Sequence, residues 1–246
     1  MSEHGNDDFA WAKFDPDAYV AHYYGDPHPD DDEVVRQTCA ALAEAGRDDL
    51  ETIDVGTGPN LFPLFAALPV ARKLSVCEYA ESNIDWMRRE LAHGKLRAPW
   101  THFWDVASNA HGARAAAIDN PIAALASRCE IAQGSIFDLP ARRWDAATMF
   151  FCAESITERH DEFERACAAF AGCVRPGGVI AAAFLAGSKG YRVGEEDYPA
   201  VSVSPESLEA AFAGLARDIR IAGIGAMAEE VRSGYSGMLF LTARAA

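Results

Sequence analysis

The sequence predicts one α/β domain with a mostly parallel β-sheet, helices on both faces of that sheet, and an antiparallel hairpin at its end. Strand-like and helical segments alternate along most of the 246 residues, which is typical of parallel strands joined by helical crossovers. The last two strand-like segments, residues 219–224 and 238–242, have no helical pattern between them, which favours an antiparallel pair. Half of the residues are hydrophobic, so the chain can bury the core of a single domain spanning 1–246.

The N-terminal part is predicted to be helical in two places. A first helical segment covers residues 17–25, after an irregular start. The acidic residues 30–33 then precede a helical pattern through Val34, Val35, Cys39 and Leu42. Carboxylates in a first helical turn complement the partial positive charge of the backbone there, which favours a helix start over a metal site.

The middle of the chain carries the patterns of the sheet itself. Strands are predicted at residues 50–55, 74–78, 129–132, 146–151 and 179–185. Helices are predicted after residue 60, around Ile84, Met87 and Leu91, in part of the alanine-rich residues 110–128, around Phe163, Cys167 and Phe170, and at residues 205–215. The RPGG motif at residues 175–178 is predicted to end one helix and turn into the next strand.

Composition excludes several classes of partner. The net charge is −15, with 22 basic against 37 acidic residues, whereas phosphate-backbone binding needs clustered basic residues, so no nucleic-acid partner is expected. No apolar run approaches the roughly 18 residues of a membrane span, and the N-terminus lacks the order of a signal peptide, so we expect a cytoplasmic protein without a membrane partner.

The residue usage adds two weaker indications. The six cysteines form no CxxC pair, which indicates buried free thiols in a reducing compartment. Alanine is abundant, and all but four of the 22 basic residues are arginine rather than lysine. Both features are typical of a GC-rich bacterial genome. Monomer and homodimer both stay open.

Residues 53–60, IDVGTGPN, place an acidic residue and a Gly-x-Gly turn directly after the first strand. A P-loop would end in Gly-Lys before Ser or Thr, and a dinucleotide fingerprint would have a third glycine where this chain has Leu61. The next strand ends in Glu78, 20 residues beyond Gly58, where a carboxylate can bond the two hydroxyls of a ribose. A nucleoside cofactor without phosphate, S-adenosylmethionine, fits these residues; the alternative is a plain strand-to-helix turn and a solvated Glu78.

The acidic strand end with its Gly-x-Gly, Glu78, RPGG and the terminal hairpin together resemble a class I methyltransferase, which implies a Rossmann-like, seven-stranded sheet. FDPDAYVAHYYG (residues 14–25), IDVGTGPNLFPLFAA (53–67) and CEYAESN (77–83) resemble more closely the family that contains nicotinamide, phenylethanolamine and indolethylamine N-methyltransferases. The similarity continues in FFCAES, VRPGGVIAAAF and GYRVGE. It implies that residues 1–48 form a helical cap that closes the cofactor site and that residues 94–128 form a helical insertion.

This resemblance implies a binding site for S-adenosylmethionine. Its residues would be Tyr19, Tyr24, Gly56, Gly58, Phe62, Glu78, Tyr79, Asn83, Ser135 and Ile136. The tyrosines of the N-terminal block and the glycines would surround the methionine moiety, Glu78 would take the ribose, and Tyr79 would pack at the adenine.

Some of these positions depart from the family or have another explanation. Phe62 stands where the family has a cofactor-contacting tyrosine, so a hydroxyl contact is lost, and Ser135-Ile136 replace an Asp-Val pair near the adenine. Read without the resemblance, Tyr19 and Tyr24 could be residues of an amphipathic helix, and Asn83 a helix-start residue.

The resemblance also implies an acceptor site. Methyl transfer from a sulfonium is an in-line displacement that needs alignment and a dry site, and no metal is expected. The catalytic candidates are Tyr19 and Glu154, because a carboxylate after the fourth strand can hold an ammonium and accept its proton. The alternative for Glu154 is a cap of the next helix. The substrate-binding candidates are Tyr23, Glu154, Phe184, Tyr191 and Trp104, with Trp100 and His102 as further possibilities.

Two departures bear on the acceptor. Phe184 stands where the nicotinamide enzyme keeps an aspartate, and Ser233-Gly234 replace the acidic pair of the catecholamine enzyme. We therefore expect a small aromatic or heteroaromatic amine other than nicotinamide or a catecholamine. Methylation of a phenol or carboxylate oxygen, and a cofactor-binding protein without catalysis, are the alternatives that the sequence leaves open.

Overall fold

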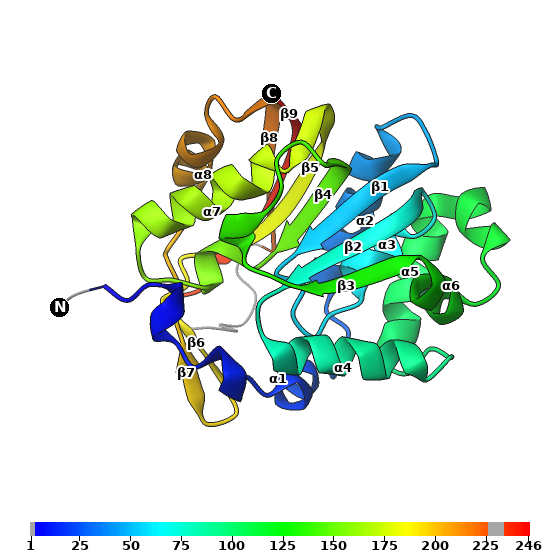
Figure 1. Ribbon diagram of the computed structural model, residues 1–246, viewed down its shortest axis with the longest axis horizontal. Coiled ribbons are helices and arrows are strands. Elements are labelled where there is room, and N and C mark those ends of the chain that lie inside the picture. The colour runs from blue at the N-terminus through cyan, green and yellow to red at the C-terminus, as the bar shows by residue number, and fades with distance from the viewer. Residues whose placement is uncertain (1–2, 226–233) are drawn as a thin grey trace.

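The computed structural model describes residues 3–225 and 234–246. Its main sheet has seven strands in the order β3-β2-β1-β4-β5-β9-β8 (Figure 1). The strands are β1 (Leu50–Val55), β2 (Ala71–Glu78), β3 (Cys129–Gln133), β4 (Trp144–Phe150), β5 (Val174–Ala186), β8 (Ala216–Ile224) and β9 (Gly237–Ala245). The strands β1 to β5 pair in parallel, whereas β9 is antiparallel to both β5 and β8. The predicted Rossmann-like sheet with a terminal antiparallel hairpin is confirmed.

The observed strands begin earlier than predicted. β2 begins at Ala71, β4 at Trp144 and β5 at Val174, so the RPGG residues lie inside β5 rather than in a turn before it. A register shift opposite Trp144 and Ala146 and a φ of +78° at Gly177 accommodate these residues in the strand. A second small sheet pairs β6 (Tyr191–Val193) with β7 (Glu196–Tyr198). It was not predicted, because three-residue strands carry almost no periodicity.

The helices alternate with the strands as predicted. The α-helices are α1 (Pro16–Tyr23), α2 (Pro29–Ala43), α3 (Phe62–Ala67), α4 (Glu81–Ala92), α5 (Trp100–His111), α6 (Pro121–Arg128), α7 (His160–Gly172) and α8 (Pro205–Phe212). Short 3₁₀ turns lie at Asn6–Asp8, Trp11–Lys13, Gly112–Ala117, Ile136–Asp138 and Ala153–Ser155. Residues 110–128 are thus helical in part. Of the acidic residues 30–33, Asp30, Asp31 and Asp32 lie in the first turn of α2, and Glu33 follows it.

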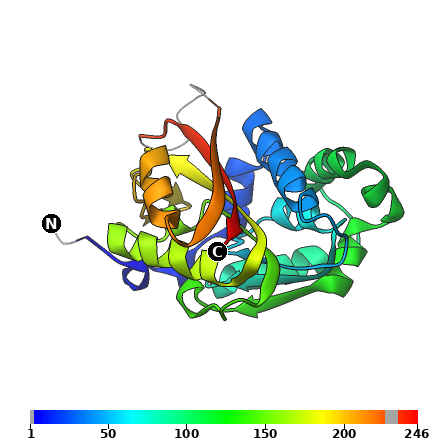
Figure 2. The ribbon, with the colours of Figure 1, turned by 90° about the horizontal axis from the view of Figure 1, so that it is seen from above.

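The sheet separates two hydrophobic layers. Figures 1 and 2 place α2 on one face of the sheet and α7 on the other. One layer joins the sheet to α2, α3 and α5, and the other joins it to α7 and α8. Successive side chains of a strand point to opposite faces, so β5 contributes Ala181, Ala183 and Leu185 to the first layer and Ile180, Ala182 and Phe184 to the second.

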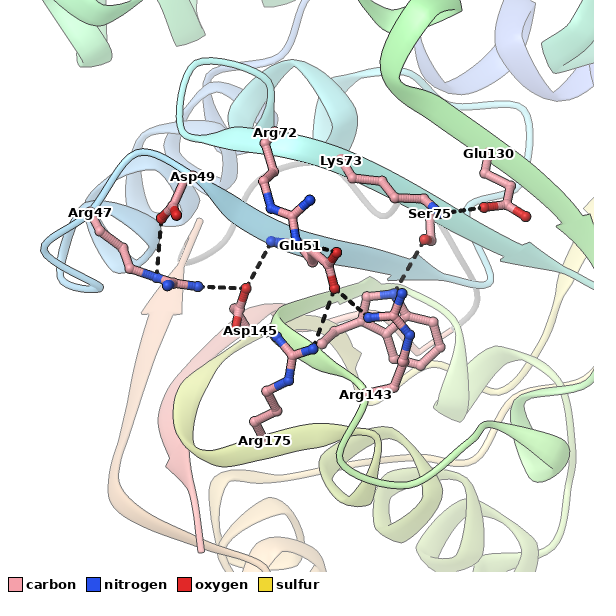
Figure 3. Close-up of polar contacts among 11 residues, drawn as sticks. Arg47, Asp49, Glu51, Arg72, Lys73, Ser75, Glu130, Arg143, Asp145 and Arg175 are labelled. Atoms are coloured by element: carbon pink, nitrogen blue, oxygen red, sulfur yellow. Dashed lines mark hydrogen bonds and ion pairs between the residues drawn. The ribbon is translucent and has the colours of Figure 1, made fainter.

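An ion-pair network ties together the amino ends of the central strands (Figure 3). The largely buried Glu51 carboxylate accepts hydrogen bonds from three guanidinium groups, and Asp145 lies 2.6 Å from two. The guanidinium groups belong to Arg47, Arg72, Arg143 and Arg175. Hydrogen bonding from Arg143 is the main cause that holds the pKa of Glu51 below its usual range. This network belongs to the edge opposite the carboxyl ends of the strands.

Candidate functional site

A cavity opens at the carboxyl edge of the sheet, where the loops after β1, β2, β3 and β4 meet the N-terminal segment. Parallel strands bring their carboxyl ends to one edge, which is why residues far apart in sequence meet there. The cavity is lined by Asn6, Trp11, Phe14, Tyr19, Tyr24, Gly56, Thr57, Gly58, Pro59, Asn60, Cys77, Glu78, Tyr79, Asn83, Gly134, Ser135, Ile136, Phe150, Phe151, Cys152, Ser155, Ile156 and Tyr191.

The two glycines of the turn after β1 have different roles. Both have a positive φ, +65° at Gly56 and +60° at Gly58, a conformation that favours glycine. A Cβ on Gly56 would lie 2.1 Å from the Cys152 sulfur, so this glycine allows the turn to pack on the loop after β4. Nothing lies within 4 Å of a Cβ on Gly58. Gly58 therefore leaves open space at the wall of the cavity.

Glu78 organises the next part of the wall from the end of β2. One carboxylate oxygen accepts the backbone N–H of Gly58 at 2.8 Å, and the other accepts that of Ala80 at 2.8 Å and the Asn83 amide at 3.3 Å. Burial raises the pKa of Glu78, and these hydrogen bonds oppose the rise. Among the described residues, the buried Asn83 Oδ1 has no hydrogen-bond partner. A ligand that donates hydrogen bonds would find acceptors at both side chains.

Asp54 lies behind the turn and is 3% exposed. Its carboxylate accepts a hydrogen bond from the Thr148 hydroxyl of β4. Burial raises the pKa of Asp54 to about 7, and the charge of Glu78 adds to that rise. Asp54 is thus a buried carboxyl group beneath the glycine turn, and its pKa lies close to neutral pH.

The N-terminal segment covers one side of the cavity. The buried Glu162 of α7 accepts the backbone N–H of Asn6 at 2.7 Å, and Trp11 donates to the Asn6 carbonyl at 2.8 Å. On the other side, the Tyr79 hydroxyl donates to the Asp7 carboxylate at 3.3 Å. Asn6, Trp11 and Phe14 are lining residues that were not predicted from the sequence. The aromatic residues Phe9, Trp11 and Phe14 in an otherwise polar terminus were the available signal.

A second cavity adjoins the first, between α1 and the β6–β7 hairpin. Tyr19 and Tyr191 line both cavities. The second cavity is also lined by the aromatic residues Phe9, Tyr23 and Tyr198 and by the polar residues His22, Glu158, Lys189, Arg192 and Asp197. Two ring pairs form its walls, Tyr19 with Tyr23 at 4.6 Å and Tyr191 with Tyr198 at 5.4 Å between ring centroids.

Comparison with known proteins identifies the family. The model of the NNMT/PNMT/TEMT family matches residues 4–246. The chain belongs to this family. Its curated relatives include phenylethanolamine N-methyltransferase of Sus scrofa, 25% identical over 92% of this chain and 85% of the relative. Nicotinamide N-methyltransferase of Homo sapiens is 21% identical over 80% of each chain.

Solved structures support the same fold. The DhpI-SAM-HEP complex superimposes with a TM-score of 0.54 at 18% identity, covering 93% of this chain and 92% of that one. The Burkholderia thailandensis 1,6-didemethyltoxoflavin-N1-methyltransferase, with bound 1,6-didemethyltoxoflavin and S-adenosylhomocysteine, has a TM-score of 0.51 at 16% identity, covering 93% of this chain and 85% of that one. The 246-residue chain, as a member of the NNMT/PNMT/TEMT family, is an S-adenosylmethionine-dependent methyltransferase.

The structure brings most of the predicted cofactor residues together. Nine of the ten line the first cavity: Tyr19, Tyr24, Gly56, Gly58, Glu78, Tyr79, Asn83, Ser135 and Ile136. Phe62 is the exception. It is fully buried in the core, where its ring packs against Tyr24 at 5.8 Å and Phe150 at 5.6 Å, so it supports the wall from behind.

The predicted acceptor residues separate into two groups. Tyr23 and Tyr191 line the second cavity. Two predicted contacts were wrong in this structure, because Phe184 is buried with Phe163 and Phe212 in the α7–α8 layer, and Trp104 packs on Phe65 in the α2–α5 layer. The argument against nicotinamide that rested on Phe184 falls with its placement. Trp100 and Phe103 pack against the Tyr24 ring, at 5.9 Å and 5.8 Å between ring centroids.

Glu154 is fully buried behind the cavity wall. Its carboxylate accepts the backbone N–H of Leu185 at 3.0 Å, and its neighbours Cys152 and Ser155 line the first cavity. It does not cap α7, which begins at His160 after Arg159 at its N-cap. Ser233, the first residue of the Ser-Gly pair, lies outside the described residues. A Cβ on Gly234 would lie 2.7 Å from the Gly187 carbonyl oxygen, just after β5.

Within residues 3–225 and 234–246, no three His, Cys, Asp or Glu side chains are grouped so that they could hold a metal ion. In the described part of the chain, no helix has the length and apolar content to cross a membrane. All six cysteines are free, and Cys129 is the least buried of them.

Proposed function

We propose that this methyltransferase acts on the nitrogen of a small aromatic or heteroaromatic amine. The observation that carries the proposal is the shared wall of the two cavities, since Tyr19 and Tyr191 line both. A cofactor in the first cavity and an acceptor in the second would meet at these two rings. Aromatic walls favour a flat ring, which stacks on them in offset or edge-on geometry. The named relatives, both N-methyltransferases, support nitrogen as the acceptor atom.

The cofactor would lie across the first cavity with its adenosine toward β2. Glu78 would accept from the ribose hydroxyls, Asn83 would bond the nucleoside, and Ser135-Ile136 would flank the adenine. Its methionine end would lie along the glycine turn, near Tyr24. The open space beside Gly58 and the acceptor atoms of Glu78 and Asn83 fit such a nucleoside.

The bound cofactor supplies an electrophilic methyl group on a positively charged sulfur. The protein's task is to align the acceptor nitrogen with that methyl and to keep water out. Tyr19 and Tyr191 would orient the acceptor ring, and the N-terminal residues 1–48 would close the site. Glu154 lines neither cavity, so it would act on an amine acceptor through its charge from behind the wall, and the acceptor's proton would leave to water.

Calorimetry followed by an acceptor screen tests the proposal. Binding of S-adenosylmethionine is measured first, and methyl transfer is then followed by mass spectrometry across aromatic amines, pyridines, phenols and carboxylic acids. Methylated amines or pyridines as the main products would support the proposal. A preference for phenols or carboxylic acids would make the protein an O-methyltransferase, and cofactor binding without transfer would indicate a non-catalytic protein.

A further inference from the structure

Asn60 ends the glycine turn, and each atom of its amide group has its own partner. Its Oδ1 accepts the backbone N–H of Phe62 at 3.0 Å, and its Nδ2 lies 3.1 Å from the Tyr24 hydroxyl oxygen. A backbone N–H can only donate, so the amide oxygen must face Phe62 and the NH₂ group must face Tyr24. Asn60 is therefore the donor in its hydrogen bond with Tyr24.

This direction decides how the Tyr24 hydroxyl is used. Because the hydroxyl oxygen accepts from Asn60, its proton is directed to an acceptor other than Asn60. The ring cannot turn freely, since Tyr24 is 3% exposed and its ring packs at 5.8 Å from both Phe62 and Phe103. Asn60 and Tyr24 both line the first cavity.

We propose that Asn60 is a positioning residue, which keeps the Tyr24 hydroxyl as a hydrogen-bond donor toward the carboxylate of the cofactor's methionine moiety. The inference rests on the part of the proposed function that lays the methionine end along the glycine turn. A hydroxyl that donates to a carboxylate makes a short, charge-assisted bond, so its orientation affects affinity. Position 62 is a phenylalanine and has no hydroxyl, whereas Tyr24, which lines the cavity, has one.

A double-mutant cycle in the full chain tests the inference by binding alone. Dissociation constants for S-adenosylmethionine and S-adenosylhomocysteine are measured by calorimetry for the wild type, Asn60→Ala, Tyr24→Phe and the double variant. We expect Asn60→Ala to weaken both ligands about tenfold, and to have no further effect in the Tyr24→Phe background. Asn60→Asp, which retains an acceptor for the Phe62 N–H, gives a second cycle if Asn60→Ala fails to fold.

A shortened ligand separates positioning from general damage to the cavity. 5′-Methylthioadenosine has the adenosine and the sulfur but no amino-acid end, so Asn60→Ala should leave its affinity within about twofold of the wild type. Equal weakening of 5′-methylthioadenosine and S-adenosylmethionine would overturn the inference, and so would an Asn60 effect that is unchanged in the Tyr24→Phe background. No acceptor is needed, so a failed methyl-transfer screen would count against the proposed function alone.

Discussion

The Glu78 carboxylate at the end of β2 accepts the Gly58 N–H of the turn after β1 at 2.8 Å. The acid and the glycine turn are thus one unit, in which the side chain that faces the cavity also holds the neighbouring backbone. Its remaining lone pairs are the ones that a ribose would use.

Replacement of Glu78 by alanine should therefore weaken cofactor binding strongly. Hydrogen bonds to a charged group contribute about 1.5–3 kcal/mol, so the dissociation constant of S-adenosylmethionine should rise roughly 10- to 150-fold. Calorimetry measures this, with Glu81→Ala on the exposed start of α4 as the control. An unchanged constant in a folded Glu78→Ala protein would remove Glu78 from the site.

Gly58→Ala should also reduce cofactor affinity, because its methyl group would occupy the open space at the cavity wall. The positive φ adds backbone strain, which must be separated from the steric effect. Gly46→Ala is the matched control, since Gly46 has a φ of +71° and nothing within 4 Å of a Cβ there. We expect the two variants to have similar melting temperatures. Only Gly58→Ala should lose affinity for S-adenosylmethionine. Equal affinities would mean that the turn is only structural.

The buried Asp54 should make stability depend on pH. Its pKa is raised to about 7 in the folded protein, against an ordinary value near 3.8, so the folded state binds the proton more tightly. The contribution of Asp54 to the free energy of unfolding is fully present below about pH 4, and it is lost as the pH rises to about 7. Asp54→Asn does not titrate, so its stability relative to the wild type should increase over that range, by at most about 1.4 kcal/mol per pH unit. Urea unfolding at several pH values measures the difference, and a constant difference would contradict the raised pKa.

Glu162 should control how fast the cofactor product leaves. Glu162→Ala removes the acceptor of the Asn6 N–H and so loosens the N-terminal segment over the cavity. We expect S-adenosylhomocysteine to dissociate severalfold faster in stopped-flow measurements. Glu164→Ala, an exposed change on the same helix, should dissociate like the wild type. If both variants behave alike, the N-terminal segment does not limit release.

Glu154→Gln should separate two kinds of acceptor. The glutamine can still accept the Leu185 N–H, so the fold should persist while the buried carboxylate charge is lost. With an amine cation as acceptor, kcat/KM should fall, because a buried negative charge that favours a nearby cation is lost. With a neutral ring nitrogen, kcat/KM should change much less. Full activity on the acceptor that the screen identifies would leave Glu154 with its hydrogen bond to Leu185 as its role.

Local sequence predicted the parts of this protein whose cause is local. The strand ending in Asp54, the glycine turn and the strand ending in Glu78 follow from hydrophobic runs and from residues that permit a positive φ. The resemblance to a known family, carried over residue by residue, supplied the ten cofactor residues, of which nine line the cavity.

The tertiary structure alone decided which face each buried residue occupies. Both faces of a parallel sheet are covered, so residues 179–186 of β5 are all apolar, and the sequence could not show that Phe184 points to α7 rather than to the acceptor. The N-terminal segment was equally hidden. Asn6 reaches the cavity because Glu162, 156 residues away, accepts its backbone N–H, and no periodicity within the segment records a contact at that separation.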